Sequence, residues 1–366
     1  MAKYVERDNP IKKIARYLLP WKGDSRTEMI RKVIFLASAV VLIVSVTMLI
    51  VNAVSSAQDA KLNDQLSDLY HGTADKADVS STVNDGNTSG SALVEIDTSK
   101  PDDGTEPAPE KEREVLEEFK PLLEINEDVV GWITMGDDGY SFVDKPVVQG
   151  KDNDYYLHRN IYGQESKWGT VFAEYRVPLT AKSEPANLIL YGHNDGGGEY
   201  FGMVPRYFNY KPGADGSIDF YKKYPTITFS TLYEKYTYKI FGGMLVNINE
   251  EDGDVFYYLR RREFDSKAQF DEYIANILDR TTFYTPVDLK YGDHLLTLST
   301  CIVDYGIEAR WVLFARRVRE GEDPTVDVSK AYPNPDPLYF DYYYKLMGGS
   351  WGGRKWPAEM IAGYSY

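Results

Sequence analysis

An uninterrupted apolar run near the N-terminus is the feature that most constrains this chain. Residues 33–51, VIFLASAVVLIVSVTMLIV, carry no charge, and the next charged residue is Asp59. A helix of that length reaches roughly 30 Å, about the thickness of the hydrocarbon core of a bilayer. The sequence therefore predicts a membrane-spanning helix over 33–54.

The flanking charges predict which side of the membrane each part of the chain occupies. Residues 1–32 carry nine Lys and Arg against four acidic residues, and basic segments of this kind stay in the cytoplasm. We therefore expect a single-pass protein with a cytoplasmic N-terminus and an extracellular remainder. A cleaved signal peptide is the alternative, since Ser55-Ser56-Ala57 offers a small-residue cleavage site. Its apolar core would be unusually long and its basic region unusually extended.

The charge of the exported part excludes one class of partner. The whole chain has a formal net charge of −15, and its first 32 residues contribute +5, which leaves −20 for the rest. A surface this acidic argues against nucleic acid or another polyanion as a partner. No His or Cys pair has metal-ligand spacing and the acidic residues form no calcium loop, so we expect neither a metal nor a cofactor.

Shifts in composition divide the exported part into three segments. Residues 55–110 are rich in Ser, Thr, Asp and Gly, with Tyr70 as their only aromatic residue. Such a segment buries too little apolar surface to offset chain entropy, so we expect a flexible stalk in which His71 is solvated. A tyrosine-rich globular domain is expected over 111–319. The aromatic-rich extension 320–366 is compatible with packing on this domain, covering a groove or binding extracellular material.

Short β-rich runs dominate the globular segment. Roughly eight strands separated by Gly, Pro and Asn predict a mainly β fold, a closed or nearly closed β-barrel with peripheral helices. Residues 235–248 are expected to form two strands broken at Gly242-Gly243, and apolar residues at helical spacing predict a helix over 264–280 that packs on the core. The other strand-like runs are 146–149, 170–175, 187–191, 226–230, 294–300 and 310–318.

The single cysteine, Cys301, ends the strand-like run LLTLSTC. One cysteine cannot form an internal disulfide, so this thiol is either a small core residue or a nucleophile. Among the four histidines, His193 is the best partner, because it follows the apolar run LILY and precedes a glycine-rich loop, where a rigid strand opens into a flexible segment. A thiol and an imidazole are the minimum for acyl transfer by a cysteine.

An arginine offers the third group that this chemistry needs. Arg310 begins the next strand-like run, nine positions after Cys301. If the two strands are adjacent, its guanidinium reaches the mouth of the site, where it can stabilise an oxyanion and favour the thiolate. An arginine at a strand start is more often simply solvated. The combination of Cys, His and Arg at strand ends is what indicates a catalytic site.

These residues carry a resemblance to a known family. TLSTC (297–301), LYGHN (190–194) and Arg310 resemble the signature of sortases, the cell-wall transpeptidases of Gram-positive bacteria. VVGWI (129–133), PVVQG (146–150) and DNDYYL (152–157) resemble the class B branch.

The resemblance implies a fold and a set of site residues. The fold would be an eight-stranded sortase barrel over 111–319. Cys301 would be the nucleophile, His193 the general acid and base, and Arg310 an oxyanion or substrate clamp. The neighbours of these residues in the two motifs are the candidates for contacting the substrate, namely Ser299, Thr300, Tyr191 and Asn194.

The resemblance also implies a reaction. Such an enzyme cleaves a sorting signal resembling Asn-Pro-x-Thr-x near the C-terminus of an exported protein, through a thioacyl intermediate, and joins the protein to a peptidoglycan amine. The helix of 33–54 would hold it at the outer membrane face, where both substrates lie. Three alternatives stay open: the same chemistry with a pilin lysine as acceptor, hydrolysis by an ordinary cysteine peptidase, and a catalytically silent, membrane-tethered binding module.

Two features bear on these alternatives. The extension 320–366 is too polar to span a membrane, which argues against the pilin-polymerising class with a C-terminal anchor. Ile302-Val303-Asp304 follows the cysteine, where a polar or acidic residue often stands in this family. Asp304 is a candidate to orient His193, although an acidic residue in a loop is more often solvated.

Overall fold

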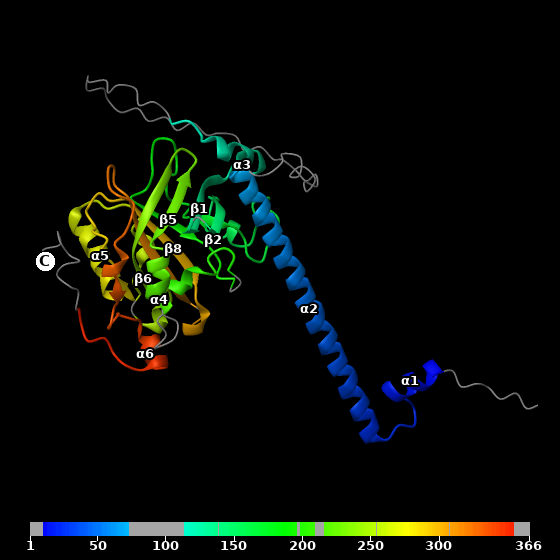
Figure 1. The fold of residues 1–366 in the computed structure, drawn as a ribbon. Coiled ribbons are helices and arrows are strands. Elements are labelled where there is room, and N and C mark those ends of the chain that lie inside the picture. Colours follow the sequence, from blue (N-terminus) through cyan, green and yellow to red (C-terminus); the bar gives the residue numbers. More distant parts are fainter. Residues whose placement is uncertain are drawn as a thin grey trace, which may run out of the picture. The chain divides into compact units, whose positions relative to one another are not determined.

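The computed structural model describes residues 10–72, 113–137, 139–195, 198–208, 216–253, 255–306 and 308–354. The chain divides into two compact units, Met1–Lys61 and Leu62–Tyr366. The first unit is helical where it is described, and the second contains a β-barrel with the short elements that cover it (Figure 1).

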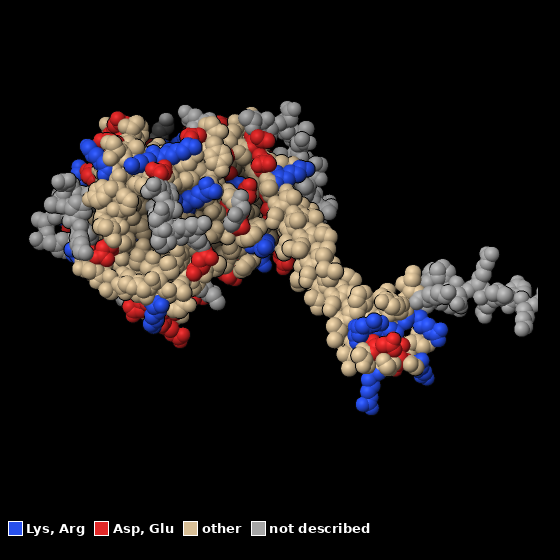
Figure 2. All heavy atoms as spheres, turned by 60° about the horizontal axis from the view of Figure 1, so that its bottom comes forward, with Lys and Arg blue, Asp and Glu red and all other residues tan. Residues whose placement is uncertain are grey.

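Two helices make up the described part of the first unit. α1 spans Pro10–Leu18, and α2 spans Arg26–Tyr70 and ends inside the second unit. Most apolar side chains of α2 within residues 33–54 are exposed, for example Leu49 at 68%. Figure 2 shows this uncharged length in tan, with Lys and Arg gathered at its N-terminal end. Within the described residues, α2 is the one helix long and apolar enough to cross a membrane.

Eight strands of the second unit form a closed barrel in the order β1-β2-β3-β4-β8-β9-β6-β5, which confirms the predicted fold class. The pairs β2-β3 and β4-β8 are parallel and the other pairs are antiparallel. The strands are β1 (Val129–Asp137), β2 (Tyr140–Val148), β3 (Val171–Ala173), β4 (Asn187–Tyr191), β5 (Thr226–Thr231), β6 (Lys235–Asn247), β8 (Leu295–Cys301) and β9 (Ala309–Arg317).

Short elements surround the barrel (Figure 1). The predicted apolar stripe on the helix of 264–280 is confirmed, because Phe270 and Ile274 are buried in one cluster with Phe314 of β9. The surrounding elements are α3 (Lys120–Ile125), α4 (Gly216–Lys223), α5 (Lys267–Arg280), α6 (Asp341–Met347) and a two-stranded sheet of β7 (Phe283–Tyr284) and β10 (Tyr332–Pro333).

The eight strands differ in two respects from the expected set. Residues 235–248 were expected as two strands, but β6 is continuous, with a register irregularity between Ile240 and Gly242. A Cβ on Gly243 would lie 2.6 Å from the ring of Trp311. Glycine here allows β6 to approach β9 closely and does not end the strand. The eighth strand is β1, whose VVGWI run had been noted only as part of the family resemblance.

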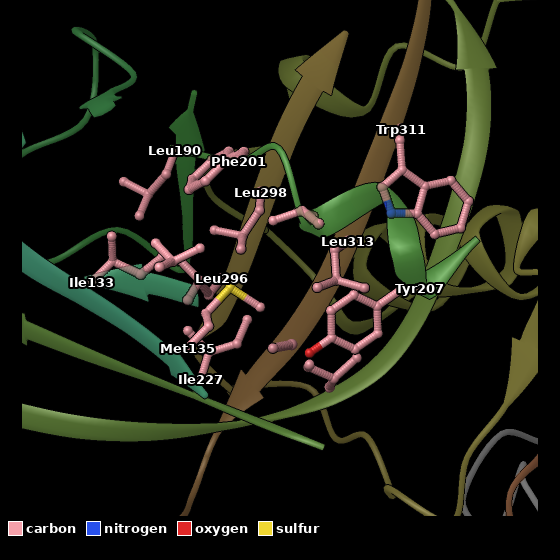
Figure 3. Close-up of a cluster of buried hydrophobic side chains, with 14 of the residues drawn as sticks. Ile133, Met135, Leu190, Phe201, Tyr207, Ile227, Leu296, Leu298, Trp311 and Leu313 are labelled. Carbon is pink, nitrogen blue, oxygen red and sulfur yellow. The ribbon is translucent and has the colours of Figure 1, made fainter. Parts of the chain in front are cut away.

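Alternate residues of the strands fill the barrel interior. Figure 3 shows Ile133 of β1, Leu190 of β4, Leu298 of β8 and Leu313 of β9 meeting there, and all belong to one buried cluster. Successive side chains of a strand point to opposite faces, so Leu295 of β8 instead joins the cluster with α5. Each such burial stabilises the fold by about 1.5–3 kcal/mol, which makes the barrel a rigid frame for its rim.

The first part of the expected stalk is helical and docked, not flexible. α2 continues to Tyr70, which is 7% exposed. The Tyr70 ring stacks on Trp132 with 4.2 Å between ring centroids, and its hydroxyl donates to Ser230 Oγ at 3.0 Å. His71, expected to be solvated, lies with Nε2 3.0 Å from a carboxylate oxygen of Asp144.

A short apolar stripe explains this docking. Leu62, Leu66, Leu69 and Tyr70 recur at helical spacing and pack in one cluster with Trp132. The polar composition of the surrounding residues conceals this stripe when 55–110 is averaged as one segment. The remaining part of the expected stalk, 73–112, lies outside the described residues.

Removing the Tyr70 ring should weaken the docking. Tyr70→Ala deletes the stacked ring and leaves a cavity, so we expect the free energy of unfolding to fall by about 3 kcal/mol. Chemical denaturation of the full chain in detergent, followed by tryptophan fluorescence, measures this change. Tyr140 is 53% exposed, and Tyr140→Ala is the control, with an expected change below about 0.5 kcal/mol. Equal effects of the two substitutions would contradict the docking.

The C-terminal extension packs on the barrel. Phe340 is 5% exposed and belongs to the interior cluster, with Tyr339 and Tyr343 packed against it. Arg354 pairs with Asp279 of α5 at 2.8 Å. Of the roles considered for 320–366, packing on the barrel is therefore the one that the structure shows, for the residues as far as Arg354. Residues 355–366 lie outside the described part of the chain.

Candidate active site

Cys301 and Arg310 stand opposite each other at one rim of the barrel. Cys301 is the last residue of β8, and its antiparallel partner in β9 is Arg310. The expected adjacency of the two strands is confirmed. Cross-strand partners point to the same face of a sheet, so the register places a permanent positive charge beside the half-buried thiol. The Arg310 side chain is 20% exposed, and its guanidinium donates to the carbonyl of Ala309 at 3.0 Å.

β4 runs along the other side of β8 and delivers His193 to the same rim. The two strands are parallel, with Tyr191 beside Ser299. The next residue, Gly192, donates its backbone N–H to the Ser299 carbonyl at 3.3 Å, and His193 follows directly. A Cβ on Gly192 would lie 2.7 Å from the ring of Phe201. The glycine of LYGHN therefore allows the chain to pass close to the Phe201 ring at this point.

The ring of His193 is held by a backbone carbonyl. Its Nε2 lies 2.9 Å from the carbonyl oxygen of Leu157. A carbonyl only accepts hydrogen bonds, so Nε2 carries a proton and Nδ1 is the nitrogen left to exchange one. Burial lowers the pKa of His193 below its usual 6.5, and nearby His158 lowers it further. Asp304, considered as an orienting group, is exposed, and the Leu157 carbonyl occupies that role.

The lowered pKa of His193 predicts that its ring titrates at a lower pH than that of a solvated histidine. Burial disfavours the imidazolium, so this ring should lose its proton at a lower pH than a solvated histidine does. We expect a midpoint below 6.5, measured from the Cε1–H NMR signal of the folded chain and assigned with a His193→Gln variant. The same chain unfolded in urea is the reference. A midpoint at or above that of the unfolded chain would contradict the burial argument.

A hollow of about 400 Å³ opens at this rim, and we name it the Cys301 hollow. It brings together the three predicted catalytic residues and three of the four predicted substrate-contacting residues. Its remaining lining is mostly apolar, which suits an extended peptide whose side chains need apolar contact. The lining residues are Asn153, Leu157, Phe172, Tyr191, Gly192, His193, Ile248, Tyr258, Leu259, Ser299, Thr300, Cys301 and Arg310.

The predicted substrate-contacting residues occupy different positions. Ser299 is 4% exposed and shares a hydrogen bond of 2.8 Å with the hydroxyl of Tyr258. Thr300 is also buried, so these two residues form the wall of the hollow and Tyr191 is more accessible. The side-chain amide of Asn194 instead donates to the Cys301 carbonyl at 3.1 Å. Asn194 thereby fixes the backbone that carries the thiol.

A buried carboxylate supports one side of the hollow and was missed at the level of sequence. Glu174 is fully buried and accepts hydrogen bonds from Tyr191 at 2.9 Å, Asn153 at 2.8 Å and Arg176 at 2.6 Å. Burial alone would raise the pKa of Glu174, but these donors outweigh it and the pKa is lowered. The ionised carboxylate fixes Tyr191 and Asn153. An acidic residue inside the apolar run TVFAEY was the available signal, because buried acids are rare without partners.

The residue after the cysteine has a structural explanation. Ile302 is 1% exposed and belongs to the cluster inside the barrel. This position therefore contributes to the core in this chain, and the departure from the expected polar residue leaves the three catalytic candidates in place.

Comparison with known proteins places this chain in a family. No family model matches the chain. A sortase B of Listeria monocytogenes is 32% identical over 188 residues, which cover 51% of this chain and 68% of that relative. The chain belongs to the class B sortase family. A sortase B of Staphylococcus aureus is 26% identical to this sortase over 204 residues, or 56% of this chain and 75% of the relative.

The solved structures agree with the sequence relatives. Sortase B from Bacillus anthracis, in a crystal structure with AAEK1, superposes on this sortase with a TM-score of 0.51 at 25% identity, over 73% of this chain and 99% of that one. This sortase is therefore a cysteine transpeptidase with an eight-stranded sortase barrel. The interpretation as a catalytically silent binding module is set aside.

Proposed function

We propose that this sortase cleaves a sorting signal resembling Asn-Pro-x-Thr-x near the C-terminus of exported proteins and joins them to a peptidoglycan amine. Cys301, His193 and Arg310 act as nucleophile, general acid and base, and oxyanion clamp. The observation that carries the proposal is that all three side chains line the Cys301 hollow.

In the first step the thiolate of Cys301 attacks the carbonyl carbon of the scissile peptide bond. The electron pair of the carbonyl moves to its oxygen, beside the Arg310 guanidinium. As the oxyanion collapses, the C–N bond breaks and the imidazolium of His193 gives its proton to the departing amine. The products are a thioester on Cys301, a free peptide amine and a neutral imidazole.

In the second step the acceptor amine attacks the thioester carbon. The neutral imidazole of His193 takes a proton from the attacking nitrogen as the new C–N bond forms. The C–S bond breaks and its electron pair returns to Cys301 as a thiolate. The lowered pKa of His193 favours this step, since the neutral ring is the form that accepts a proton.

Arg310→Met tests the proposed clamp. Removal of a charged oxyanion partner should lower kcat/KM for transpeptidation by about 10²–10³. The unbranched side chain of Met replaces the aliphatic part of the arginine side chain and so keeps its packing on the strand. Arg206→Met, at an exposed arginine of the second unit, is the control and should keep the activity within about twofold. A loss no greater than that of the control would remove Arg310 from the mechanism.

We also propose that α2 anchors the enzyme in the membrane, with a cytoplasmic N-terminus and an extracellular barrel. The exposed apolar length of α2 supports this location, and so do the basic residues of 1–32. An anchor at the outer membrane face would raise the effective concentration of exported substrates and of a lipid-linked acceptor. To test this location, Ser183 is replaced by cysteine (Ser183→Cys) and intact cells are treated with a membrane-impermeant thiol reagent. The barrel should be labelled at this position only if it lies outside the cell.

A competition experiment tests the choice of acceptor. The full chain in detergent receives Asn-Pro-x-Thr-x peptides with equal amounts of a diamino acid and of a lysine-containing pilin-type peptide. Ligation to the diamino acid supports attachment to peptidoglycan. Preferential ligation to the lysine peptide would overturn the proposed acceptor in favour of pilin assembly, and release of hydrolysed peptide alone would indicate a peptidase.

A further inference from the structure

A second hollow adjoins the turn Tyr258–Arg260, which also helps to line the Cys301 hollow. It has a volume of about 390 Å³, and we name it the arginine hollow after Arg260, Arg261 and Arg280, which line it. Glu272 is the only carboxylate among its described lining residues. A positive surplus at one hollow is unusual in a chain whose net charge is −15, and it indicates a local preference for anions.

Two of the three guanidinium groups rest on aromatic rings. Arg260 lies over the ring of Tyr257 at 3.6 Å from its centroid, and Arg280 over Phe256 at 5.1 Å. Stacking on the ring face leaves the N–H edge of a guanidinium able to bind an oxyanion. Across the described part of the chain, neither Arg260 nor Arg261 pairs with a carboxylate within 4.0 Å.

The backbone beneath these arginines is fixed. The side-chain amide of Asn187 donates to the Arg261 carbonyl at 2.8 Å. The backbone N–H of Asn187 donates to the Arg262 carbonyl at 2.9 Å. Asn187 is fully buried in β4. The arginine-bearing turn is thus tied to the barrel, which lowers the entropic cost of binding a ligand there.

One turn lines both hollows. The 3₁₀ turn Tyr258–Arg260 contributes Tyr258 and Leu259 to the Cys301 hollow and Arg260 to the arginine hollow. The Tyr258 hydroxyl is bonded to Ser299, two residues before the nucleophile. The same short turn therefore carries Arg260 of the arginine hollow and part of the lining of the catalytic site.

We propose that the arginine hollow binds the anionic part of the amine-bearing acceptor. This inference rests on the proposed function, because it assigns a second contact to the substrate of the second step. Guanidinium pairs bind carboxylates and phosphates through charge-assisted hydrogen bonds. An acceptor held at its oxyanion by Arg260 and Arg261 presents its amine at higher effective concentration to the thioester on Cys301.

The test uses the full chain in detergent and two acceptors that differ in one charge. One is a diamino acid with a free carboxylate and the other is its carboxamide. Arg260→Gln/Arg261→Gln should raise KM for the carboxylate acceptor by about tenfold, with KM for the carboxamide and the rate of thioester formation unchanged. Arg206→Gln/Lys222→Gln removes the same charge from exposed positions and should change neither KM. Equal behaviour of the two double variants would overturn the proposal.

Inorganic pyrophosphate identifies the source of the anion and gives a measurement that is independent of catalysis. Calorimetry should detect binding of pyrophosphate or the diamino acid to the wild type and its loss in Arg260→Gln/Arg261→Gln. Tighter binding of pyrophosphate points to the phosphates of a lipid-linked acceptor, and tighter binding of the diamino acid points to a peptide carboxylate. Absence of both would overturn the site. If no thioester forms with any peptide, the proposed function fails while this binding result still decides the site.

Discussion

Cys301→Ala should abolish transpeptidation, with kcat/KM falling by at least about 10⁴. In the proposed mechanism the sulfur of the thiolate forms the covalent intermediate, and the chain has no second cysteine to replace it. Ala fills nearly the same volume at the end of β8, where the residue is only half-buried, so the barrel should keep its stability. Ligation of a sorting peptide to an amine, followed by chromatography, measures the loss.

Two controls separate chemistry from folding in this experiment. The circular dichroism spectrum and the unfolding midpoint of Cys301→Ala should match those of the wild type. Alkylation of the wild-type thiol should reproduce the loss without any substitution. Residual ligation within about tenfold of the wild type would show that another group carries the reaction.

His193→Gln should lower kcat/KM by about 10³. Gln keeps a polar side chain of similar length, but it can neither protonate the departing amine nor take a proton from the acceptor. The ring nitrogen bonded to the Leu157 carbonyl already carries a proton, so the missing function is that of Nδ1. Steady-state kinetics with separate measurement of thioester formation and aminolysis should show that both steps are slowed.

His158 provides the matched control for His193. Its ring centroid lies 6.4 Å from that of His193, and it does not line the Cys301 hollow among the described residues. His158→Gln should keep kcat/KM within about threefold and move the pKa of His193 upward, because His158 lowers that pKa. A loss as large as that of His193→Gln would place the proton transfers elsewhere.

The barrel, and the meeting of the three catalytic candidates at one rim of it, could be predicted because the signals were local. The period of the strands identified most of the barrel, and each catalytic candidate stands at or beside one end of a strand-like run. The adjacency of Cys301 and Arg310 needed only one assumption about strand order, and the register of β8 and β9 meets it. The break expected at Gly242-Gly243 was wrong because the fit of glycine against Trp311 is a tertiary property.

Other features depend on contacts between distant segments and were beyond sequence pattern. The apolar stripe that ends at Tyr70 occupies about two helical turns inside a polar segment, and its partner Trp132 lies in β1. The supporting role of Glu174 can be recognised only from the hydrogen-bond donors that surround it in the fold. The arginine hollow joins the turn of Tyr258 to α5, and no spacing along the chain indicates that Arg260 and Arg280 line one cavity.

The central claim is that Cys301 carries an acyl group between two substrates, and intact-mass measurement of the full chain tests it most directly. After mixing with an Asn-Pro-x-Thr-x peptide, the wild type should gain the mass of the acyl fragment, and Cys301→Ala should gain none. Addition of a diamino acid should remove this mass from the protein and yield the ligated product. No adduct with any sorting peptide, or an adduct that also forms on Cys301→Ala, would contradict the account.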